Sequence, residues 1–322
     1  MGIRVPAEWE KQKSIMVVFP TTQKDWQHSI EEIQKGYVNF IKTITRFQTC
    51  VVICNNKKIL NKYFDSFENI EIHEIKTDDT WIRDFGAIDV FIDGELKSYN
   101  FNFNAWGSKF EATMDNDFNK TFFKKNLLHV DFVLEGGSID NNGNGVMLST
   151  AKCLFNENRN STCKEEDIEK KIKKLFGLTE LIVLKNGALM GDDTDAHIDT
   201  LARFIDKETI AYVKCYDKHD IHFKELNKME KELEKTNFRL IPLPLPGSKT
   251  FKKHRLPATY LNFVFINGAL IVPTYNDKND KKVIKILKKE IKNREIIEID
   301  ASIFIREHGS LHCSCISQML QM

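Results

Sequence analysis

Apolar residues along the chain follow two spacings, one typical of helices and the other of strands. In residues 27–47 they recur at intervals of three and four, which places them on one face of an amphipathic helix. Short apolar runs at residues 14–19 and 49–54 suit buried strands on either side of that helix. Helical spacing also predicts helices at residues 57–67, 116–128, 164–176, 222–235 and 281–292.

Strands and hairpins separate these helices. Asp93-Gly94 joins residues 81–92 to 97–103, and this dipeptide is typical of a hairpin turn. Further hairpins are expected from residues 130–139 with 145–154 and from 261–266 with 270–273. Single strands are expected at residues 70–75, 180–184, 209–215, 238–242 and 296–299.

Helices therefore alternate with a strand and a hairpin about five times. A doubly wound parallel sheet would instead alternate single strands with helices. Small mixed sheets repeated around an axis, as in a propeller, fit the pattern better. No linker rich in Pro, Gly or Ser interrupts the chain, so residues 1–322 are expected to form a single α/β domain.

Composition and charge narrow the class of protein. The 322 residues include 47 Lys and Arg against 46 Asp and Glu, a formal net charge of +1, which gives no signature of nucleic-acid or anionic-membrane binding. The 7 cysteines show no C-x-x-C spacing, and the N-terminus has no apolar signal segment. The apolar run at residues 260–273 is too short and too polar to span a bilayer. A cytoplasmic protein with reduced thiols, and with no membrane or nucleic-acid partner, is expected.

Residues 191–204 carry the first candidate chemistry. Ile198 and Phe204 lie among residues that predict a strand, in which His197 and Asp199 would project to the same face. A base and a carboxylate on one face, just after an acidic turn, can bind and process a cationic substrate. The alternative is a solvated loop that runs into an ordinary strand with an incidental His.

Residues 77–86 combine three Asp with a Trp and an Arg where a strand is expected to begin. Trp81 offers an aromatic wall and Asp84 a carboxylate, and a guanidinium group prefers bidentate carboxylate pairing and stacking. A flat cation is therefore a candidate ligand. The alternative is a capped turn with a surface Asp–Arg pair.

Two further stretches carry possible site residues. Glu135 directly precedes Gly136-Gly137 at a strand end, where glycine often marks a bulge or a close ligand contact. Near the C-terminus, Cys313 and Cys315 follow a segment containing Gly and Ser, and either thiol is a candidate nucleophile if a His lies nearby in the fold. The alternatives are an exposed Glu at a β-bulge and two buried structural thiols.

The sequence supports neither a metal nor an organic cofactor. His219 and His222 have no Cys or Glu at the spacing of a zinc site. No Gly-x-Gly-x-x-Gly or P-loop motif is present, so a nucleotide cofactor has no support.

Taken together, these stretches resemble the agmatine deiminase family, relatives of the bacterial peptidyl-arginine deiminases within the guanidine-modifying superfamily. The resemblance covers nearly the whole chain, with the motifs in the family's order and at similar spacing. The matching motifs lie at residues 6–10, 79–84, 103–107, 135–139, 143–148, 156–160, 197–199 and 312–313.

The resemblance implies a five-bladed α/β propeller with pseudo-fivefold symmetry (a pentein fold) and neither metal nor cofactor. It implies that Cys313 is the nucleophile and His197 the general acid/base. It also implies that Asp84 and Asp199 grip the guanidinium group while Glu135 supports the site. Thiolate attack would then release ammonia and leave a thiouronium intermediate, which water hydrolyses to a ureido product.

The chain departs from the family pattern near the nucleophile and near the base. Ala196 stands where the family usually has the glycine before the His, and residues 85–87 differ from the usual Thr-Gly-Pro. Alignment on Gly309 and the His before the Cys selects Cys313, whereas alignment on Cys-Ile-Ser-Gln selects Cys315. The preceding His and the Gly four residues back favour Cys313.

The leading prediction is hydrolysis of agmatine to N-carbamoylputrescine and ammonia, a step toward putrescine. Free arginine and peptidyl arginine are alternative substrates. An enzyme that modifies arginine in peptides or proteins would be expected to be secreted. A catalytically silent propeller that binds cationic amines is the alternative outside enzymes. Family resemblance also implies a small cationic guanidino substrate and a possible homo-oligomer. Nothing in the sequence identifies what meets the distal amine of the substrate.

Overall fold

Parallel and antiparallel strand pairs are combined in each of the main sheets. The computed structural model describes residues 2–21, 23–123 and 125–321, and within them lie five mixed sheets of three or four strands and one two-stranded ribbon. The sheets, in spatial order, are β19 (Cys315–Met319), β2 (Gln12–Val18), β3 (Thr49–Cys54) and β4 (Ile70–Glu74); β1 (Ile3–Arg4), β5 (Ile88–Ile92), β6 (Glu95–Asn102) and β7 (Leu127–Val133); β10 (Glu180–Leu184), β9 (Val146–Thr150) and β8 (Asp140–Asn141); β11 (Ala202–Asp206), β12 (Thr209–Lys214) and β13 (Arg239–Pro244); and β16 (Val264–Ile266), β17 (Ala269–Thr274) and β18 (Glu295–Asp300). The ribbon pairs β14 (Thr250–Phe251) with β15 (His254–Arg255).

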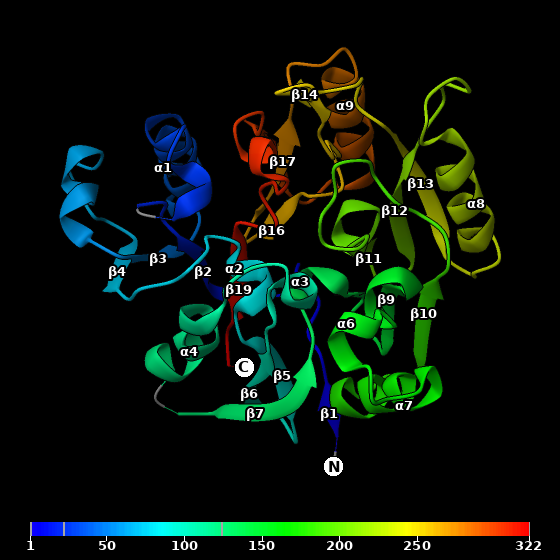
Figure 1. Cartoon of the computed structure of the whole chain (residues 1–322), viewed down its shortest axis with the longest axis horizontal. Coiled ribbons are helices and arrows are strands. Elements are labelled where there is room, and N and C mark those ends of the chain that lie inside the picture. Colours follow the sequence, from blue (N-terminus) through cyan, green and yellow to red (C-terminus); the bar gives the residue numbers. More distant parts are fainter. Residues whose placement is uncertain (1, 22, 124, 322) are drawn as a thin grey trace.

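A long helix connects one parallel pair in each main sheet, because parallel neighbours need a crossover connection. These helices join β2 to β3, β6 to β7, β9 to β10, β12 to β13 and β17 to β18. In that order they are α1 (Ile30–Thr45), α4 (Thr113–Phe122), α7 (Glu165–Phe176), α8 (Phe223–Leu233) and α9 (Asp280–Glu290). Figure 1 shows them at the outside of the molecule, whereas the short helix α2 (Ile82–Phe85) and β19 lie near its middle.

The remaining helices are short and lie in connections between strands. They are α3 (Ala105–Ser108), α5 (Ala151–Leu154), α6 (Glu157–Asn160) and the 3-10 helices η1 (Lys24–Trp26), η2 (Lys57–Lys62), η3 (Gly136–Ser138), η4 (Ile198–Thr200) and η5 (Phe304–Glu307).

The apolar spacing that predicts α1 is confirmed by burial. Ile33, Tyr37 and Phe40 have no exposed surface and belong to the larger apolar cluster of the fold. A second cluster includes Tyr99 of β6 and Phe176 of α7, whose rings lie 6.0 Å apart edge to face. An apolar face thus packs these helices against the sheets. The loops that connect helices and strands remain available to form a functional site.

The hairpin predicted at Asp93-Gly94 is confirmed, but the one predicted from residues 130–139 and 145–154 is wrong. β5 and β6 are antiparallel, and both turn residues have positive φ, as this turn requires. β7, in contrast, pairs with β6 in its own sheet, and the antiparallel partner of β9 is the short strand β8. The two glycines of η3 interrupt the extended run and carry the chain from one sheet to the next.

Residues 82–85 form α2 rather than the beginning of a strand, which corrects the prediction for residues 81–92. A helical turn brings residues three apart to one side. Trp81 and Asp84 therefore face the same region, which a strand beginning here would not have achieved. Residues 57–62 form a 3-10 helix, shorter than the predicted helix at 57–67.

A search for membrane-spanning helices among the described residues found no helix that combines the necessary length with the necessary apolarity.

Candidate active site

A cavity of about 190 Å³ gathers side chains from distant parts of the chain. Trp81, Asp84, His197, Asp199 and Cys313 all line it, so the structure brings these five sequence-predicted residues together. Glu135 does not line the cavity but lies behind His197, and Cys315 lies outside the lining.

The segment that carries His197 and Asp199 is not the predicted strand. His197 caps η4, and β11 begins only at Ala202. The two preceding residues, Asp195 and Ala196, both have φ of 68°, a left-handed conformation that glycine adopts most readily. Ala196 therefore keeps the backbone shape that suits glycine, and this turn aims both His197 and Asp199 at the cavity.

Gly137 explains the Gly-Gly motif after Glu135. A Cβ atom at Gly137 would lie 2.7 Å from His197 Nδ1, 2.8 Å from Asp84 Oδ1 and 3.2 Å from Asp199 Oδ2. Any side chain here would push those three groups apart. The Gly137 N–H also donates to Asp84 Oδ1 at 2.9 Å, so the glycine backbone helps to hold the carboxylate in place.

Trp106 holds the other oxygen of Asp84, since its indole Nε1 donates to Oδ2 at 3.0 Å. The residues from Ala105 to Ser108 all have positive φ, between 50° and 90°. Such a run is costly for residues other than glycine and persists only where surrounding contacts enforce it. Burial raises the pKa of Asp84, and the charges of Asp199 and Glu135 add to that rise.

His197 lies between two buried carboxylates. Nδ1 is 3.6 Å from Asp84 Oδ1, and Nε2 is 3.8 Å from Glu135 Oε2. Neither ring nitrogen has a hydrogen-bond partner among the residues that the structure describes. Burial alone lowers the pKa of His197, but the charge of Asp84 and the contacts with Cys153 and Glu135 outweigh it and raise the pKa well above its usual value. The raised pKa favours the protonated imidazolium form of His197 at the wall of the cavity.

Asp199 is held by a second histidine. His312 Nδ1 lies 2.7 Å from Asp199 Oδ2, and Nε2 lies 3.0 Å from Glu8 Oε2. Burial raises the pKa of Asp199, but the hydrogen bond and charge of His312 outweigh burial and lower it. Glu8 is also paired with Arg203, which binds Asp140 at 2.7 Å.

Glu135 is 1% exposed, which excludes the exposed Glu of the alternative interpretation. Arg159 Nε donates to both of its carboxylate oxygens, at 2.8 and 2.9 Å. The same guanidinium group binds Asp195 Oδ2 at 2.9 Å and the carbonyl of Thr194 at 3.0 Å. Arg159 therefore fixes Glu135 behind His197 and also ties down the turn that precedes it.

The two candidate thiols have different surroundings. Cys313 Sγ lies 3.4 Å from Asn262 Oδ1 and 3.8 Å from Asp199 Oδ2, at the wall of the cavity. Cys315 is the first residue of β19, is fully buried, and directs Sγ toward the carbonyl of His312 at 3.7 Å. Burial raises the pKa of the Cys313 thiol, and the charges of Asp199 and Asp84 raise it further. Geometry thus favours Cys313 as the thiol that a ligand in the cavity can reach.

Sequence reasoning assigned no role to Trp106, Asn262 or His312. The Trp and the His stand in motifs of the family resemblance, but a motif does not indicate which atoms meet. Asn262 accepts the backbone N–H groups of His312 and Cys313, at 2.9 and 3.2 Å, from a segment about 50 residues away in the chain. Local sequence around Asn262 gives no signal for this contact.

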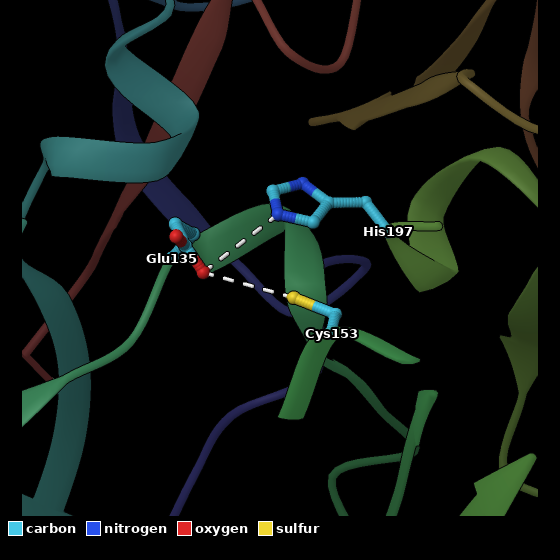
Figure 2. Close-up of side chains that lie close together, drawn as sticks. All are labelled: Glu135, Cys153 and His197. Atoms are coloured by element: carbon cyan, nitrogen blue, oxygen red, sulfur yellow. Dashed lines mark hydrogen bonds and ion pairs between the residues drawn. The ribbon is translucent and has the colours of Figure 1, made fainter. Parts of the chain in front are cut away.

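One buried group among the described residues has donor atoms suited to a metal ion. It consists of Glu135, Cys153 and His197, and no two of its donor atoms are more than 4.8 Å apart. Figure 2 shows Glu135 facing the other two, with one carboxylate oxygen directed to both His197 and Cys153.

Comparison with known proteins identifies the family to which the chain belongs. The sequence model of the Porphyromonas-type peptidyl-arginine deiminase family matches residues 4–318. An agmatine deiminase from Pseudomonas aeruginosa is 27% identical over 97% of this chain and 94% of its own length.

Solved structures extend the likeness to the whole fold. A cysteine-to-serine variant of C. jejuni agmatine deiminase, with substrate bound, is 48% identical and has a TM-score of 0.97 over 99% of this chain and 96% of its own. An amidinotransferase from Microseira wollei, 13% identical with a TM-score of 0.55, shares the fold over 98% of this chain and 96% of its own. The chain therefore belongs to the Porphyromonas-type peptidyl-arginine deiminase family and, within it, groups with the agmatine deiminases.

Proposed function

We propose that this protein is an agmatine deiminase that hydrolyses agmatine to N-carbamoylputrescine and ammonia. The observation that carries the proposal is the charge of the cavity. Its lining holds seven carboxylate residues and, within the described part of the chain, neither Lys nor Arg. The acidic residues are Asp25, Asp79, Asp84, Asp192, Asp193, Asp199 and Glu307.

The guanidinium group binds at the end of the cavity that holds Cys313. Asp84 and Asp199 accept its N–H groups and fix its plane, because paired carboxylates match the donor geometry of guanidinium. Trp81 provides an apolar wall, and its ring packs against Gly309 and against Trp26 with centroids 5.7 Å apart. The cation also relieves the repulsion between the buried carboxylates.

Thiolate attack forms the first intermediate. The substrate cation offsets the burial and the negative charges that keep Cys313 protonated, and so favours the thiolate. Sγ attacks the guanidinium carbon and gives a tetrahedral adduct. His197 donates its proton to one amino nitrogen, which leaves as ammonia when the carbon–nitrogen bond breaks. The product of this half-reaction is an S-alkylthiouronium cation attached to Cys313.

Water completes the reaction at the same carbon. Neutral His197 removes a proton from the attacking water, and the new carbon–oxygen bond replaces the carbon–sulfur bond. Cys313 leaves as the thiolate, and the resulting protonated urea releases its excess proton to solvent. Glu135, held by Arg159, stabilises the imidazolium form of His197 in both steps.

The distal end of the cavity favours agmatine over arginine. Asp193 and Glu307 lie among the lining residues, and burial is the main cause that raises the pKa of each carboxyl, that of Asp193 to about 6. A terminal ammonium group stabilises such carboxylates, whereas the α-carboxylate of arginine would meet their like charge. Free arginine is therefore the weaker substrate.

The wider proposals follow from the same family membership. We infer that the five mixed sheets are the blades of a propeller with pseudo-fivefold symmetry, and that residues 1–322 form one catalytic domain. All seven cysteines are free, which supports a cytoplasmic location. A homo-oligomer is also expected, and light scattering on the purified protein will measure it.

Ammonia release tests the function. Agmatine, arginine and a blocked peptidyl-arginine analogue are offered separately, with a chelator present and no added metal. We expect turnover of agmatine and at most weak turnover of the others; the Cys313→Ser variant serves as the blank. Turnover of the blocked analogue instead would make this a peptidyl-arginine deiminase, and no turnover of any substrate would favour a non-catalytic amine binder.

A further inference from the structure

Cys153 is a buried thiol that the deiminase mechanism does not use, although it lies next to the mechanism's base. It belongs to α5 and is 1% exposed. Its Sγ lies 3.7 Å from Glu135 Oε2, the same oxygen that lies 3.8 Å from His197 Nε2 (Figure 2). A thiol, an imidazole and a carboxylate therefore meet around one small volume.

We propose that Glu135, Cys153 and His197 form a binding site for a thiophilic divalent ion such as Zn²⁺, and that the bound ion inhibits the enzyme. The inhibition rests on the proposed deiminase function, whereas the metal binding does not. The mechanism needs no metal, so the site is regulatory rather than catalytic.

The donor set matches the preference of zinc. Cysteine sulfur, histidine nitrogen and a carboxylate oxygen are its usual protein ligands, and tetrahedral sites with bonds of about 2.0–2.3 Å place donors roughly 3.3–3.8 Å apart. Two of the donor separations here are 3.7 and 3.8 Å, and none exceeds 4.8 Å. A small rotation of the imidazole or thiol completes three ligands, and water completes the fourth.

Two further features make the site available. His197 is 1% exposed, yet neither of its ring nitrogens has a hydrogen-bond partner among the described residues, so ligation breaks no such bond of the ring. The acidic cavity that His197 lines concentrates divalent cations on the other side of the imidazole ring. Arg159, bound to Glu135, opposes metal affinity, but Glu135 and the thiolate together offset the charge of the ion.

Metal binding would stop both half-reactions. Binding displaces the thiol proton of Cys153 and the imidazolium proton of His197, because both groups ligate in their deprotonated forms. The ligated imidazole can then neither protonate the leaving amine nor accept a proton from water. At saturating Zn²⁺ we expect roughly a hundredfold loss of kcat, the lower range of what a positioned acid–base group contributes.

Binding is tested with Co²⁺ as a spectroscopic probe, in a variant that has no nucleophile. Cys313→Ser protein, freed of metal by a chelator, should show a thiolate-to-cobalt charge-transfer band, and the additional Cys153→Ala substitution should remove it. A band that is absent from the Cys313→Ser protein, or that survives the second substitution, would overturn the site. This measurement does not depend on catalysis.

Inhibition is tested by titrating Zn²⁺ into wild type, Cys153→Ala and, as matched control, Cys163→Ser, whose cysteine is exposed. The Cys153→Ala enzyme should need at least about tenfold more Zn²⁺ for half inhibition, and Cys163→Ser should match wild type. Equal inhibition of all three would refute the regulatory role. If the metal-free wild type has no deiminase activity, the proposed function fails, and the cobalt spectrum still decides the site.

Discussion

The imidazole of His312 lies between two carboxylates, 2.7 Å from Asp199 on one side and 3.0 Å from Glu8 on the other. It thereby connects the N-terminal segment to the wall of the cavity, directly beside the cysteine at position 313. Removal of one partner from a buried charge pair is usually far more harmful than absence of the pair, because the other charge is left unsatisfied.

The substitution His312→Ala should therefore damage both activity and stability. It leaves Asp199 and Glu8 buried without their shared partner, at a cost of about 3–5 kcal/mol. We expect kcat/KM for agmatine to fall more than about a hundredfold and the free energy of unfolding to decrease. Steady-state kinetics and denaturant unfolding measure these effects. His219→Ala, at an exposed position, is the control, and normal kinetics in His312→Ala would show that Asp199 needs no partner.

Trp106→Phe isolates the contribution of one hydrogen bond to Asp84. The substitution keeps an aromatic ring but removes the indole N–H that donates to Oδ2 at 3.0 Å. A hydrogen bond to a charged group contributes about 1.5–3 kcal/mol, so kcat/KM should decrease roughly 10- to 150-fold. The measurement is steady-state kinetics with agmatine, checked against the unfolding curve. An unchanged kcat/KM would mean that Gly137 alone suffices to hold the carboxylate.

Gly137→Ala should reduce kcat/KM for agmatine about a hundredfold. The added methyl group would lie within 2.8 Å of both His197 Nδ1 and Asp84 Oδ1. Cβ atoms in real structures essentially never approach other atoms so closely. Both groups would have to move away from the guanidinium site, and a misplacement of about 1 Å can reduce the rate about a hundredfold. Gly2→Ala, where nothing lies within 4 Å, is the matched control. Wild-type kinetics in Gly137→Ala would contradict the convergence of these groups.

Fold elements that depend on contacts between residues close in sequence could be predicted from the sequence, whereas those that depend on distant residues could not. The α1 helix and the Asp93-Gly94 hairpin depend on local spacing and turn chemistry, and both were predicted correctly. The strand expected to include His197 and Phe204 begins only at Ala202, because apolar alternation cannot reveal that Arg159 and Asp192 hold the turn before His197 left-handed.

Long-range contacts set the rest of the candidate site. Family resemblance indicated Cys313, His197 and the two guanidinium carboxylates, but nothing local indicates that Asn262 binds the backbone around Cys313. The overall acidity of the cavity lining is equally hidden in the sequence. It arises from segments as distant as residues 25, 193 and 307, which only the folded chain brings together.

The two C-terminal thiols should differ sharply when each is replaced by serine. Cys313→Ser should eliminate ammonia release, because Sγ of Cys313 is the thiol that lines the cavity. Cys315→Ser should keep most of the activity, since that side chain lies outside the cavity lining within β19. Ammonia assays on both variants, with unfolding curves to confirm that each is folded, make the comparison. The opposite pattern would assign the nucleophile to Cys315 and overturn the alignment.

The pH dependence of thiol reactivity tests the electrostatics of the site without substrate. Burial raises the pKa of Cys313, and Asp199, 3.8 Å away, raises it further because a carboxylate opposes formation of a second negative charge. Iodoacetamide reacts with the thiolate, so its rate at Cys313 should still increase at about pH 9, beyond the usual thiol range. Peptide mass spectrometry separates Cys313 from the other cysteines.

Asp199→Asn should shift that alkylation profile toward lower pH. The neutral amide no longer repels the thiolate, so the pKa of Cys313 falls and more thiolate is present at each pH below it. The direction is decisive, because a loss of packing alone would change the alkylation rate at every pH by the same factor. Asp167→Asn, on the exposed face of α7, controls for the change in net charge and should leave the profile in place. A profile in Asp199→Asn that stays fixed or moves to higher pH would mean that Asp199 does not control the charge of Cys313, and that burial and Asp84 keep the thiol protonated until the substrate cation arrives.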